Sequence, residues 1–375
     1  MQRSGGAGRQ LRVLVTVTFN ENQLRAHLLP IVALSDVTEV VLVTDEAPAP
    51  LPKVRVVVPS PLLVRIAGRA GAKLLTCLRI AIRERPDWVI GFNLVPHGAN
   101  AILTARVVRT KSLYAMIGGH REWFEGGWSS DNKILGRLRS PSPAVERLLL
   151  RLIRRSTRVA TMGAVGRAQL IARGVDGDRI TTIPPAVDVE RFAPRAGEVD
   201  HAYDVITVAA LLPNKRVADV LDAAAKLVPH RPALRVAIVG RGPLDAQLRA
   251  QVRRLGLDDV VDLLGFRDDV DALYVRSGIF VLPSASEGLS IAMLEAMASG
   301  VPPVVTDVGE LGSIVRDGEN GRLFQPGDVD ALASILEQLL ADPALASSLG
   351  AAAADTARST VSVDAVAASY RKLFG

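Results

Sequence analysis

The chain has 375 residues, of which 49% are hydrophobic and 22% are charged, and its formal net charge is +6. This composition is typical of globular proteins, and the length suits two domains, so disorder of the whole chain is excluded. The single cysteine, Cys77, excludes an intrachain disulfide framework and a cysteine-built zinc site. The five histidines form no H-x-x-x-H pair, and no uncharged apolar run is long enough to cross a bilayer.

The apolar stretch 11–19 follows basic residues but has no small-residue cleavage site after it. We therefore interpret it as a first buried strand and not as a signal peptide. This interpretation predicts a soluble, cytoplasmic protein.

The charge divides unevenly along the chain. Residues 1–196 contain 29 Lys and Arg against 15 Asp and Glu, a net charge of +14, whereas residues 197–375 contain 16 against 24, a net charge of −8. A basic half indicates an anionic partner, which could be membrane lipid, nucleic acid or an acidic substrate.

The first half alternates short β-rich runs with helical patterns, which predicts a parallel sheet covered on both faces. The expected strands are 11–18, 37–44, 54–58, 87–91, 112–116, 158–162 and 179–183, and the expected helices are 22–34, 62–85, 96–109, 143–155 and 163–173.

The second half repeats the alternation. Strands are expected at 204–209, 234–239, 260–263, 279–282 and 303–306, and helices at 215–228, 244–255, 270–276, 289–299 and 329–340. Prolines at 184 and 185 favour extended backbone and indicate a boundary. We predict two α/β doubly wound domains at 1–190 and 191–358, with a C-terminal helix at 359–375 that packs back toward the first domain.

A strand that ends at Leu282 runs into a turn of small residues, and a helix is expected to open near Gly288. The amides of residues 288–291 (Gly288, Leu289, Ser290 and Ile291) would be unpaired there, which suits a phosphate. Glu287 precedes this helix and Glu295 follows two turns on, roughly 12 Å along the axis. The pattern predicts one ligand held by Glu287 at a sugar, by amides at phosphates and by Glu295 at a ribose. The alternative is two glutamates in solvent.

The run 286–296 resembles the E-x7-E motif of retaining GT-B glycosyltransferases, specifically glycosyltransferase family four. Four further segments resemble that family in order: a donor-phosphate loop at 208–216, a glycine-rich turn at 239–243, a base-contacting segment at 264–270 and a landmark at 318–328. The likeness is strong over about 180–350 and weaker before. It implies a GT-B fold, with two Rossmann-like doubly wound domains facing across a cleft, and hexosyltransferase chemistry.

The resemblance assigns donor-binding roles to Lys215, Arg216, Arg241 and Gly242 at the phosphates, and to Phe266 and Arg267 at the base. Lys215 is also expected to act in catalysis with Glu287. Alternatives are a solvated Lys215 and a core role for Phe266. The family usually has an arginine where this chain has Ala210, which leaves open whether Arg216 or Arg241 replaces that cation.

The first half is expected to bind the acceptor. His120 lies on a glycine-rich loop after strand 112–116 and resembles a histidine that the family often places in its active site, so we expect it to be catalytic. His97 opens another loop after a strand and is a weaker acceptor-binding candidate. Arg121 and Glu122 could bind acceptor hydroxyls or form a surface ion pair.

The mechanism that the resemblance implies needs no cofactor, no metal and no separate general base, because the departing diphosphate takes the acceptor's proton. Three D-x-D triplets, at 176–178, 269–271 and 328–330, are better explained as turns and caps than as metal ligands. A UDP-sugar donor is favoured on family frequency alone.

Basic residues recur along 62–85 and 145–159, which indicates either a helix face on an anionic bilayer or a solvated face. Aromatic residues are only 4% of the chain, which disfavours nucleic acid. We therefore expect a lipid-linked or saccharide acceptor, in glycolipid, polysaccharide or glycoconjugate biosynthesis, and a protein that is cytoplasmic or peripheral on the inner face of the membrane. The alternatives are a GT-B-fold nucleotide-sugar epimerase and a non-enzymatic membrane-surface binding protein.

Overall fold

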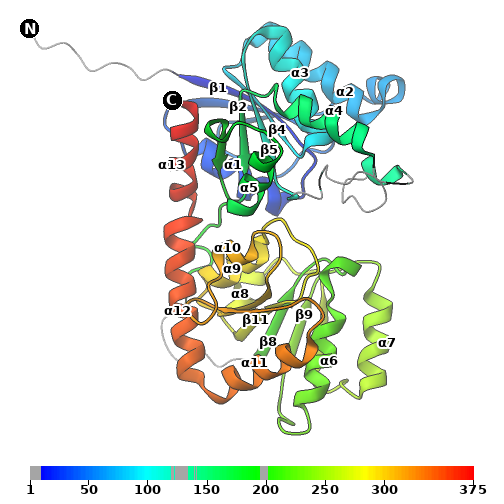
Figure 1. The fold of residues 1–375 in the computed structure, drawn as a ribbon, viewed down its shortest axis with the longest axis vertical. Helices are drawn as coiled ribbons and strands as arrows, with labels where there is room; N and C mark the ends of the chain where they lie inside the picture. The colour runs from blue at the N-terminus through cyan, green and yellow to red at the C-terminus, as the bar shows by residue number, and fades with distance from the viewer. Residues whose placement is uncertain (1–9, 120–121, 123–133, 139, 141, 195–201) are drawn as a thin grey trace, which may run out of the picture. The chain divides into compact units, whose positions relative to one another are not determined.

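The computed structural model describes residues 10–119, 122, 134–138, 140, 142–194 and 202–375. The chain forms two compact units, each an α/β structure (Figure 1). The N-terminal unit comprises Met1–Ala186 together with Val366–Gly375, and the C-terminal unit comprises Val187–Ala365. The last ten residues therefore belong to the N-terminal unit, where Phe374 lies with its ring centroid 5.2 Å from that of Trp88.

The N-terminal unit is built on a seven-stranded parallel sheet with strand order β3-β2-β1-β4-β5-β6-β7. Its strands are β1 (Leu11–Thr16), β2 (Val37–Val43), β3 (Val54–Val57), β4 (Trp88–Phe92), β5 (Lys111–Met116), β6 (Arg158–Thr161) and β7 (Ile180–Thr182). Its helices are α1 (Glu21–Val32), α2 (Pro61–Glu84), α3 (Ala99–Val108), α4 (Pro143–Ile153), α5 (Ala164–Ala172) and α13 (Val363–Phe374).

The C-terminal unit is built on a six-stranded parallel sheet with strand order β10-β9-β8-β11-β12-β13. Its strands are β8 (Tyr203–Val208), β9 (Val236–Val239), β10 (Val261–Gly265), β11 (Ser277–Leu282), β12 (Pro303–Thr306) and β13 (Arg322–Phe324). Its helices are α6 (Ala218–Leu227), α7 (Asp245–Leu255), α8 (Val270–Tyr274), α9 (Ile291–Ala298), α10 (Leu311–Ile314), α11 (Val329–Ala341) and α12 (Pro343–Thr360).

The two parallel sheets confirm the predicted fold class, and each expected strand is present. Three elements were not predicted, and one of them is α10, a single turn of four residues. Strand β13 has only three residues, too few for a β pattern to show. Helix α12 carries a run of alanines in place of a clear apolar stripe, and it packs closely against α9.

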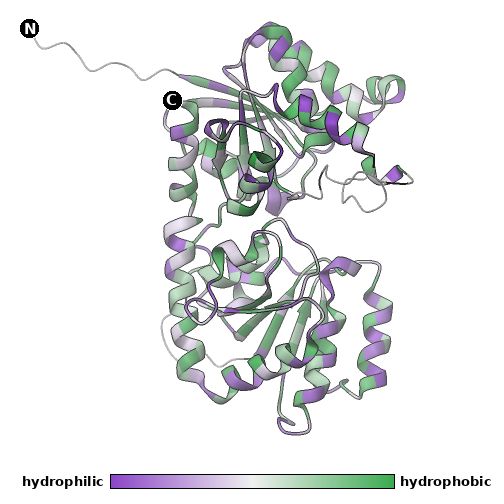
Figure 2. Cartoon of the chain, in the orientation of Figure 1, coloured by the Kyte–Doolittle hydropathy of each residue, from purple (hydrophilic) through white to green (hydrophobic). Residues whose placement is uncertain are grey.

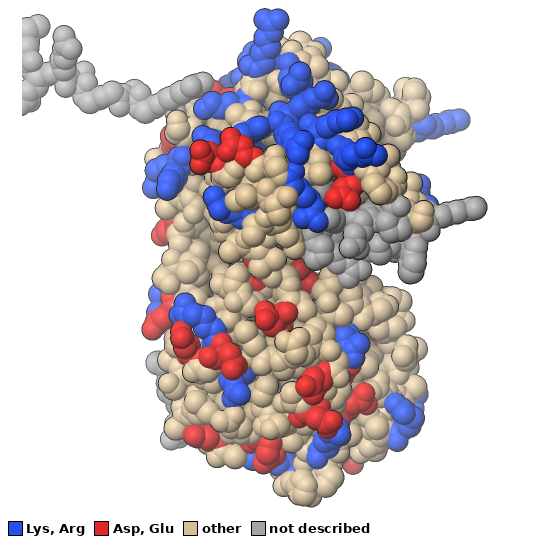
Figure 3. Space-filling model, in the orientation of Figure 1, with Lys and Arg blue, Asp and Glu red and all other residues tan. Residues whose placement is uncertain are grey.

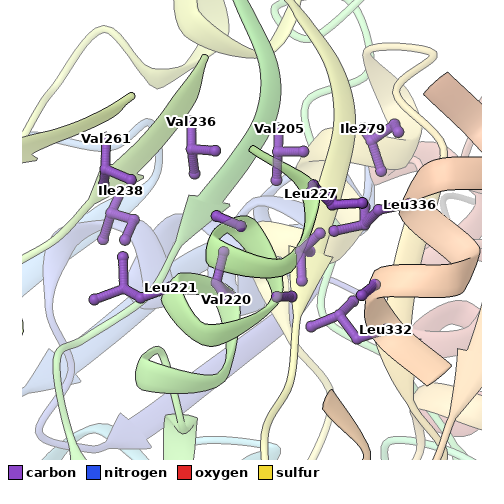
Figure 4. Packing of buried hydrophobic residues seen from close by; sticks show 14 of the residues in the cluster. Val205, Val220, Leu221, Leu227, Val236, Ile238, Val261, Ile279, Leu332 and Leu336 are labelled. Atoms are coloured by element: carbon purple, nitrogen blue, oxygen red, sulfur yellow. The ribbon is translucent and has the colours of Figure 1, made fainter. Parts of the chain in front are cut away.

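The strands are the most apolar parts of both units, as Figure 2 shows. In the C-terminal unit, side chains from β8, β9, β10 and β11 pack against α6 and α11 (Figure 4). Val205 of β8, Leu221 of α6 and Leu332 of α11 are each almost wholly buried. This packing fixes the strands, and with them the loops that follow their carboxyl ends.

Charge also distinguishes the two units. Lys and Arg side chains gather on the N-terminal unit, whereas the C-terminal unit presents both signs (Figure 3). Within the described ranges, no helix has the length and apolar character that crossing a membrane requires.

Candidate active site

The candidate site lies where the C-terminal sheet reverses its order of connection. Strands β8 and β11 are neighbours in the sheet although two strands separate them along the chain. The loops that follow them are tied together, because the amide of Ala285 donates to the carbonyl of Asn214 at 2.8 Å. Open parallel sheets bind ligands at such a point, outside the carboxyl ends of the strands.

Lys215 and Glu287 meet at this point. Lys215 Nζ lies 2.5 Å from Glu287 Oε1, and the hydroxyl of Ser284 donates to the same oxygen at 2.7 Å. The Lys215 side chain is 19% exposed and that of Glu287 is 7% exposed. The expectation that Lys215 opens a helix was wrong, because it ends a 3₁₀ turn (Pro213–Lys215) and α6 begins only at Ala218. The alternative of a lysine loose in solvent is excluded by this pairing.

Helix α9 begins at Ile291, three residues later than expected at Gly288. Ser290 is its N-cap and accepts a hydrogen bond from the amide of Met293 at 3.2 Å. Within the part of the chain that the structure describes, the amides of residues 288–292 donate to no other protein atom. These five N–H groups are therefore available to an anion. Those of Gly288 and Leu289 lie in the loop before the helix, and not in its first turn.

Glu295 lies about one turn inside α9, so the expected spacing of two helical turns from Glu287 was wrong. Its residue exposure is only 3%, which excludes the surface alternative. Burial and the neighbouring Glu295 carboxylate raise the pKa of Tyr274 well above its ordinary value. The Tyr274 hydroxyl also donates to the carbonyl of Ala292 at 3.0 Å, which fixes this part of the helix.

Two glycines allow the β9 loop to approach the β8 loop. A Cβ atom on Gly240 would lie 1.8 Å from the carbonyl oxygen of Ala209, and one on Gly242 would lie 2.4 Å from that of Leu211. The amide of Leu211 donates to the carbonyl of Arg241 at 3.0 Å. Only residues without a side chain permit this close contact.

The three candidate arginines differ in their partners. Arg216 binds both carboxylate oxygens of Asp219, at 2.8 and 3.1 Å, and Arg267 binds both of Asp269, at 2.7 and 2.6 Å. Among the described residues, Arg241 has no carboxylate partner and its guanidinium lies 4.9 Å above the ring of Phe266. Of the three, Arg241 is the arginine whose charge is not paired with a carboxylate in the described residues. Phe266 is 58% exposed, so the core-packing alternative is wrong.

His97 and Glu122 are buried, not exposed to an acceptor. His97 Nδ1 lies 3.3 Å from the Thr16 hydroxyl, and burial lowers the pKa of His97 to about 3. Glu122 accepts a short hydrogen bond from the Tyr114 hydroxyl, and burial raises the pKa of Glu122 to about 7. A surface ion pair at Glu122 is excluded by its 3% exposure. His120 and Arg121 lie outside the described residues.

A buried polar cluster that was not predicted lies at the carboxyl ends of β1 and β2. Lys73 Nζ donates to Asp45 at 2.7 Å and to the Thr18 hydroxyl at 2.5 Å. The basic pattern of 62–85 placed Lys73 on an exposed face, but the residue is only 2% exposed. The signal was its helical spacing to Cys77 and Ala81, which puts it on the apolar face of α2.

Two of the three D-x-D triplets form a turn and a helix cap, as expected, but the side chain of Asp269 does not cap α8. Asp176 accepts from the amide of Asp178, and Asp328 accepts from that of Ala331 at the start of α11. Asp269 pairs with Arg267. No group of three or more His, Cys, Asp or Glu side chains in the described ranges could hold a metal ion.

The fold and this site define a glycosyltransferase of the GT-B type, and comparison with known proteins names the family. The model described as "Glycosyltransferase Family 4" matches residues 35–191, and that described as "Glycosyl transferases group 1" matches residues 188–356. The two adjoining matches span most of the chain. The protein therefore belongs to glycosyltransferase family four, which confirms the resemblance seen in the sequence.

Among curated relatives, the chain is similar to the putative glycosyltransferase EpsD of Bacillus subtilis, 33% identical over 186 residues that make up 49% of each chain. It is also 27% identical over 288 residues to the amylovoran biosynthesis glycosyltransferase AmsK of Erwinia amylovora, covering 72% of this chain and 67% of AmsK. The matches span about half the length, or less, of the first relatives. Anabaena Alr3699/HepE, solved with UDP and glucose, has the same fold, with a TM-score of 0.76 and 18% identity over 97% of this chain and 99% of that one.

Proposed function

We propose that this protein transfers a sugar from a nucleoside-diphosphate donor to a hydroxyl acceptor, with retention at the anomeric carbon, in polysaccharide or glycoconjugate biosynthesis. The observation that carries the proposal is the Lys215–Glu287 pair at the switch point of the C-terminal sheet, beside unpaired amides. A cation, a run of N–H donors and a carboxylate meet there, which is the set of groups that a sugar diphosphate needs.

In the proposed mechanism, Lys215 and Arg241 neutralise the diphosphate while the amides of residues 288–292 donate to its oxygens. Glu287 binds the transferred sugar and Glu295 the ribose. As the glycosidic C–O bond breaks, negative charge grows on the leaving diphosphate, and preorganised donors aimed at that charge lower the barrier by several kcal/mol. The diphosphate then takes the proton of the acceptor hydroxyl, which attacks on the same face. No metal is assigned a step, because fixed cations and amides supply the positive charge.

Uracil is the base we propose, since HepE was solved with UDP and with UDP-glucose. The segment of Phe266 and Arg267, at the carboxyl end of β10, would present its backbone to that base. A relative from Escherichia coli, 29% identical over 184 residues, is named a UDP-Gal:alpha-D-GlcNAc-diphosphoundecaprenol galactosyltransferase. We accordingly propose a saccharide or lipid-linked acceptor and a site of action at the cytoplasmic side of the membrane.

The test is calorimetric titration with UDP, GDP, ADP and dTDP, followed by transfer assays with the sugars of whichever nucleotide binds. Lys215→Ala should abolish UDP binding, and Glu287→Gln should abolish transfer in a protein that still binds UDP. Lys226→Ala is the matched control, because Lys226 also pairs with a carboxylate, that of Asp330, but in an exposed position on α6.

Three further readouts separate the alternatives. Proton NMR of the product reports the anomeric configuration, and inversion would contradict retention. Full activity in EDTA is expected, and loss of activity that Mg²⁺ restores would contradict metal independence. Isomerisation of the donor without any acceptor would identify an epimerase in place of a transferase.

A further inference from the structure

The helices α2, α3 and α4 of the N-terminal unit expose a group of large aliphatic side chains. Helices α2 and α3 pack side by side, and α3 and α4 share one buried cluster beneath, so the three form one layer on the sheet. The aliphatic side chains that point outward from this layer are Leu62, Ile66, Leu75 and Ile82 of α2, Leu103 and Val107 of α3, and Leu148 of α4. Figure 2 shows green and purple interleaved on these helices.

The first turns of α2 carry the most exposed of these residues. Ile66 is 75% exposed and Leu62 is 66% exposed, the two highest values among the large hydrophobic residues that the structure describes. Gly68 has left-handed backbone (φ 68°) and interrupts the helix just after them. The first turns of α2, with Leu62 and Ile66, thus form a short amphipathic helical segment that is separated from the rest of α2 by Gly68. Single exposed leucines are ordinary, but a gathering of this kind marks an interaction surface.

Positive charge surrounds these apolar side chains and exceeds the acidic charge of the three helices. The exposed basic residues of the layer are Arg65, Arg69, Arg79 and Arg83 of α2, Arg106 of α3, and Arg147 and Arg151 of α4. The acidic residues of the three helices are Glu84 and Glu146, which pair with Arg55 at 2.5 Å and with Arg173 at 3.6 Å. Each of these acids is therefore neutralised by an arginine from outside the layer. Figure 3 shows Lys and Arg side chains gathered on the N-terminal unit, which carries this layer.

We propose that this layer, defined by the outward residues of α2, α3 and α4, docks on the surface of a lipid bilayer that contains anionic lipid. Aliphatic side chains enter the boundary between headgroups and acyl chains, and the arginines bind the lipid phosphates. Docking of this kind is independent of the catalytic step, and it brings the protein to the surface where a lipid-linked acceptor resides.

A second copy of the chain fits this layer less well. The C-terminal unit is acidic, but its described exposed large hydrophobic residues are Leu212 and Phe266, both in the loops of the candidate site. That unit would satisfy the arginines and leave Leu62 and Ile66 without an apolar partner. A bilayer with anionic headgroups satisfies both kinds of side chain.

The test is flotation of the full chain with vesicles of phosphatidylcholine alone and of phosphatidylcholine mixed with phosphatidylglycerol, at low and at high salt. Binding is expected only to the mixed vesicles, and it should weaken as salt rises. The double variant Arg65→Gln, Arg69→Gln should lower the partition coefficient about thirtyfold, because each basic residue near an anionic surface contributes about 1 kcal/mol. The double variant Leu62→Ser, Ile66→Ser should lower it as well.

The matched control is Arg253→Gln, Arg254→Gln, which removes two exposed arginines of α7 in the C-terminal unit. It should leave vesicle binding unchanged. Equal losses in control and test variants, or no binding to mixed vesicles at low salt, would overturn the proposal. Sedimentation velocity without vesicles gives an independent check, because a dimer that Leu62→Ser, Ile66→Ser dissociates would identify the layer as a protein interface. Tryptophan fluorescence of each variant reports whether the N-terminal unit is still folded, because Trp88 is buried in that unit.

Discussion

The Nζ atom of Lys215 lies 2.5 Å from Oε1 of Glu287, although 72 residues separate them in the chain. The contact exists because β8 and β11, which precede the two residues, are neighbours in the sheet. The candidate site therefore depends on the order of the strands in the sheet. The sequence around Lys215 or around Glu287 does not show which residue is its partner.

Ser284 shares Glu287 Oε1 with Lys215, so we expect it to position that carboxylate. Ser284→Ala should lower kcat about tenfold. A hydrogen bond to a charged group contributes about 1.5–3 kcal/mol, and a water molecule that takes the place of the hydroxyl reduces the loss to the lower end of that range. The dissociation constant for UDP should stay the same. Ser299→Ala is the control, since that buried hydroxyl donates only to the carbonyl of Glu295 at the end of α9. An equal fall in kcat for both variants would argue against a positioning role.

Arg241 and Arg216 should respond differently to loss of charge. Arg241→Gln is expected to weaken UDP binding on the order of tenfold, since a charge-assisted hydrogen bond is worth about 1.5–3 kcal/mol. Arg216→Gln should leave UDP binding nearly unchanged, because its charge is already committed to Asp219. Ala210→Arg should strengthen binding. Calorimetry at two salt concentrations measures the UDP affinity of all three variants. A larger loss of affinity in Arg216→Gln than in Arg241→Gln would indicate that Arg216 supplies the cation in place of Ala210.

Gly242 should not tolerate a side chain. Its Cβ would lie 2.4 Å from the carbonyl oxygen of Leu211, so Gly242→Ala must push the β8 loop away from the β9 loop. We expect loss of UDP binding together with a lower melting temperature. Gly256→Ala is the control, because Gly256 has φ +68° but open space around its Cβ. That change should cost about 1 kcal/mol of stability and leave UDP binding intact.

Lys73 and Asp45 form a mostly buried ion pair in the N-terminal unit. We expect the effects of replacing the two residues on the unfolding free energy to be coupled. Lys73→Met removes the nearest cation from the carboxylate of Asp45, at a cost of about 1–3 kcal/mol, because that side chain is still 22% exposed. The double variant Lys73→Met, Asp45→Leu should recover a large part of that loss, because an apolar pair avoids the desolvation of both charges. Urea unfolding followed by tryptophan fluorescence measures this, since all three tryptophans lie within the first 128 residues. If the losses of unfolding free energy in Lys73→Met and Asp45→Leu simply add up in the double variant, the two residues are not coupled.

The alternation of strands and helices was enough to predict the fold, because parallel strands buried on both faces are continuous apolar runs. It was also enough to locate the loop of Glu287, since a strand, small residues and a glycine follow in order. The start of α9 was misplaced because Gly288 resembles a helix start, whereas the hydroxyl of Ser290 provides the cap. Local patterns identify candidates for a cap but do not choose between neighbours.

Partners were the main feature that the sequence could not supply. Arg216 and Arg241 cannot be distinguished in the sequence alone. In the structure, Arg216 pairs with Asp219 and Arg241 lies over the ring of Phe266. The sequence also did not show that His97 and Glu122 are buried, and a surface ion pair was one alternative for Glu122. A buried polar group needs a partner to offset desolvation, and that partner usually lies far away in sequence.

Acid should destabilise the N-terminal unit through its buried histidines. Burial lowers the pKa of both His27 and His97 from 6.5 to about 3. Between those values the unfolded chain binds more protons, so the unfolding free energy falls as pH falls, by up to about 1.4 kcal/mol per unit for each histidine. Glu122 acts in the opposite sense between pH 4.5 and about 7, because its raised pKa makes the folded state hold the extra proton. The two histidines together outweigh Glu122 below pH 6.5.

His27→Phe isolates one of these contributions. The ring of His27 packs against those of Phe19 and Phe92, with centroids 5.3 and 5.0 Å away, so phenylalanine keeps the packing and removes the titration. Between pH 4.5 and 6.5 we expect the variant's unfolding free energy to be nearly independent of pH, since His97 and Glu122 then offset each other. Urea unfolding at pH 5 and 6.5, read from tryptophan fluorescence, measures the slope. His230→Gln, a change at an exposed histidine of the other unit, should keep the wild-type slope. If His27→Phe also keeps it, His27 is not the group that binds the proton on unfolding.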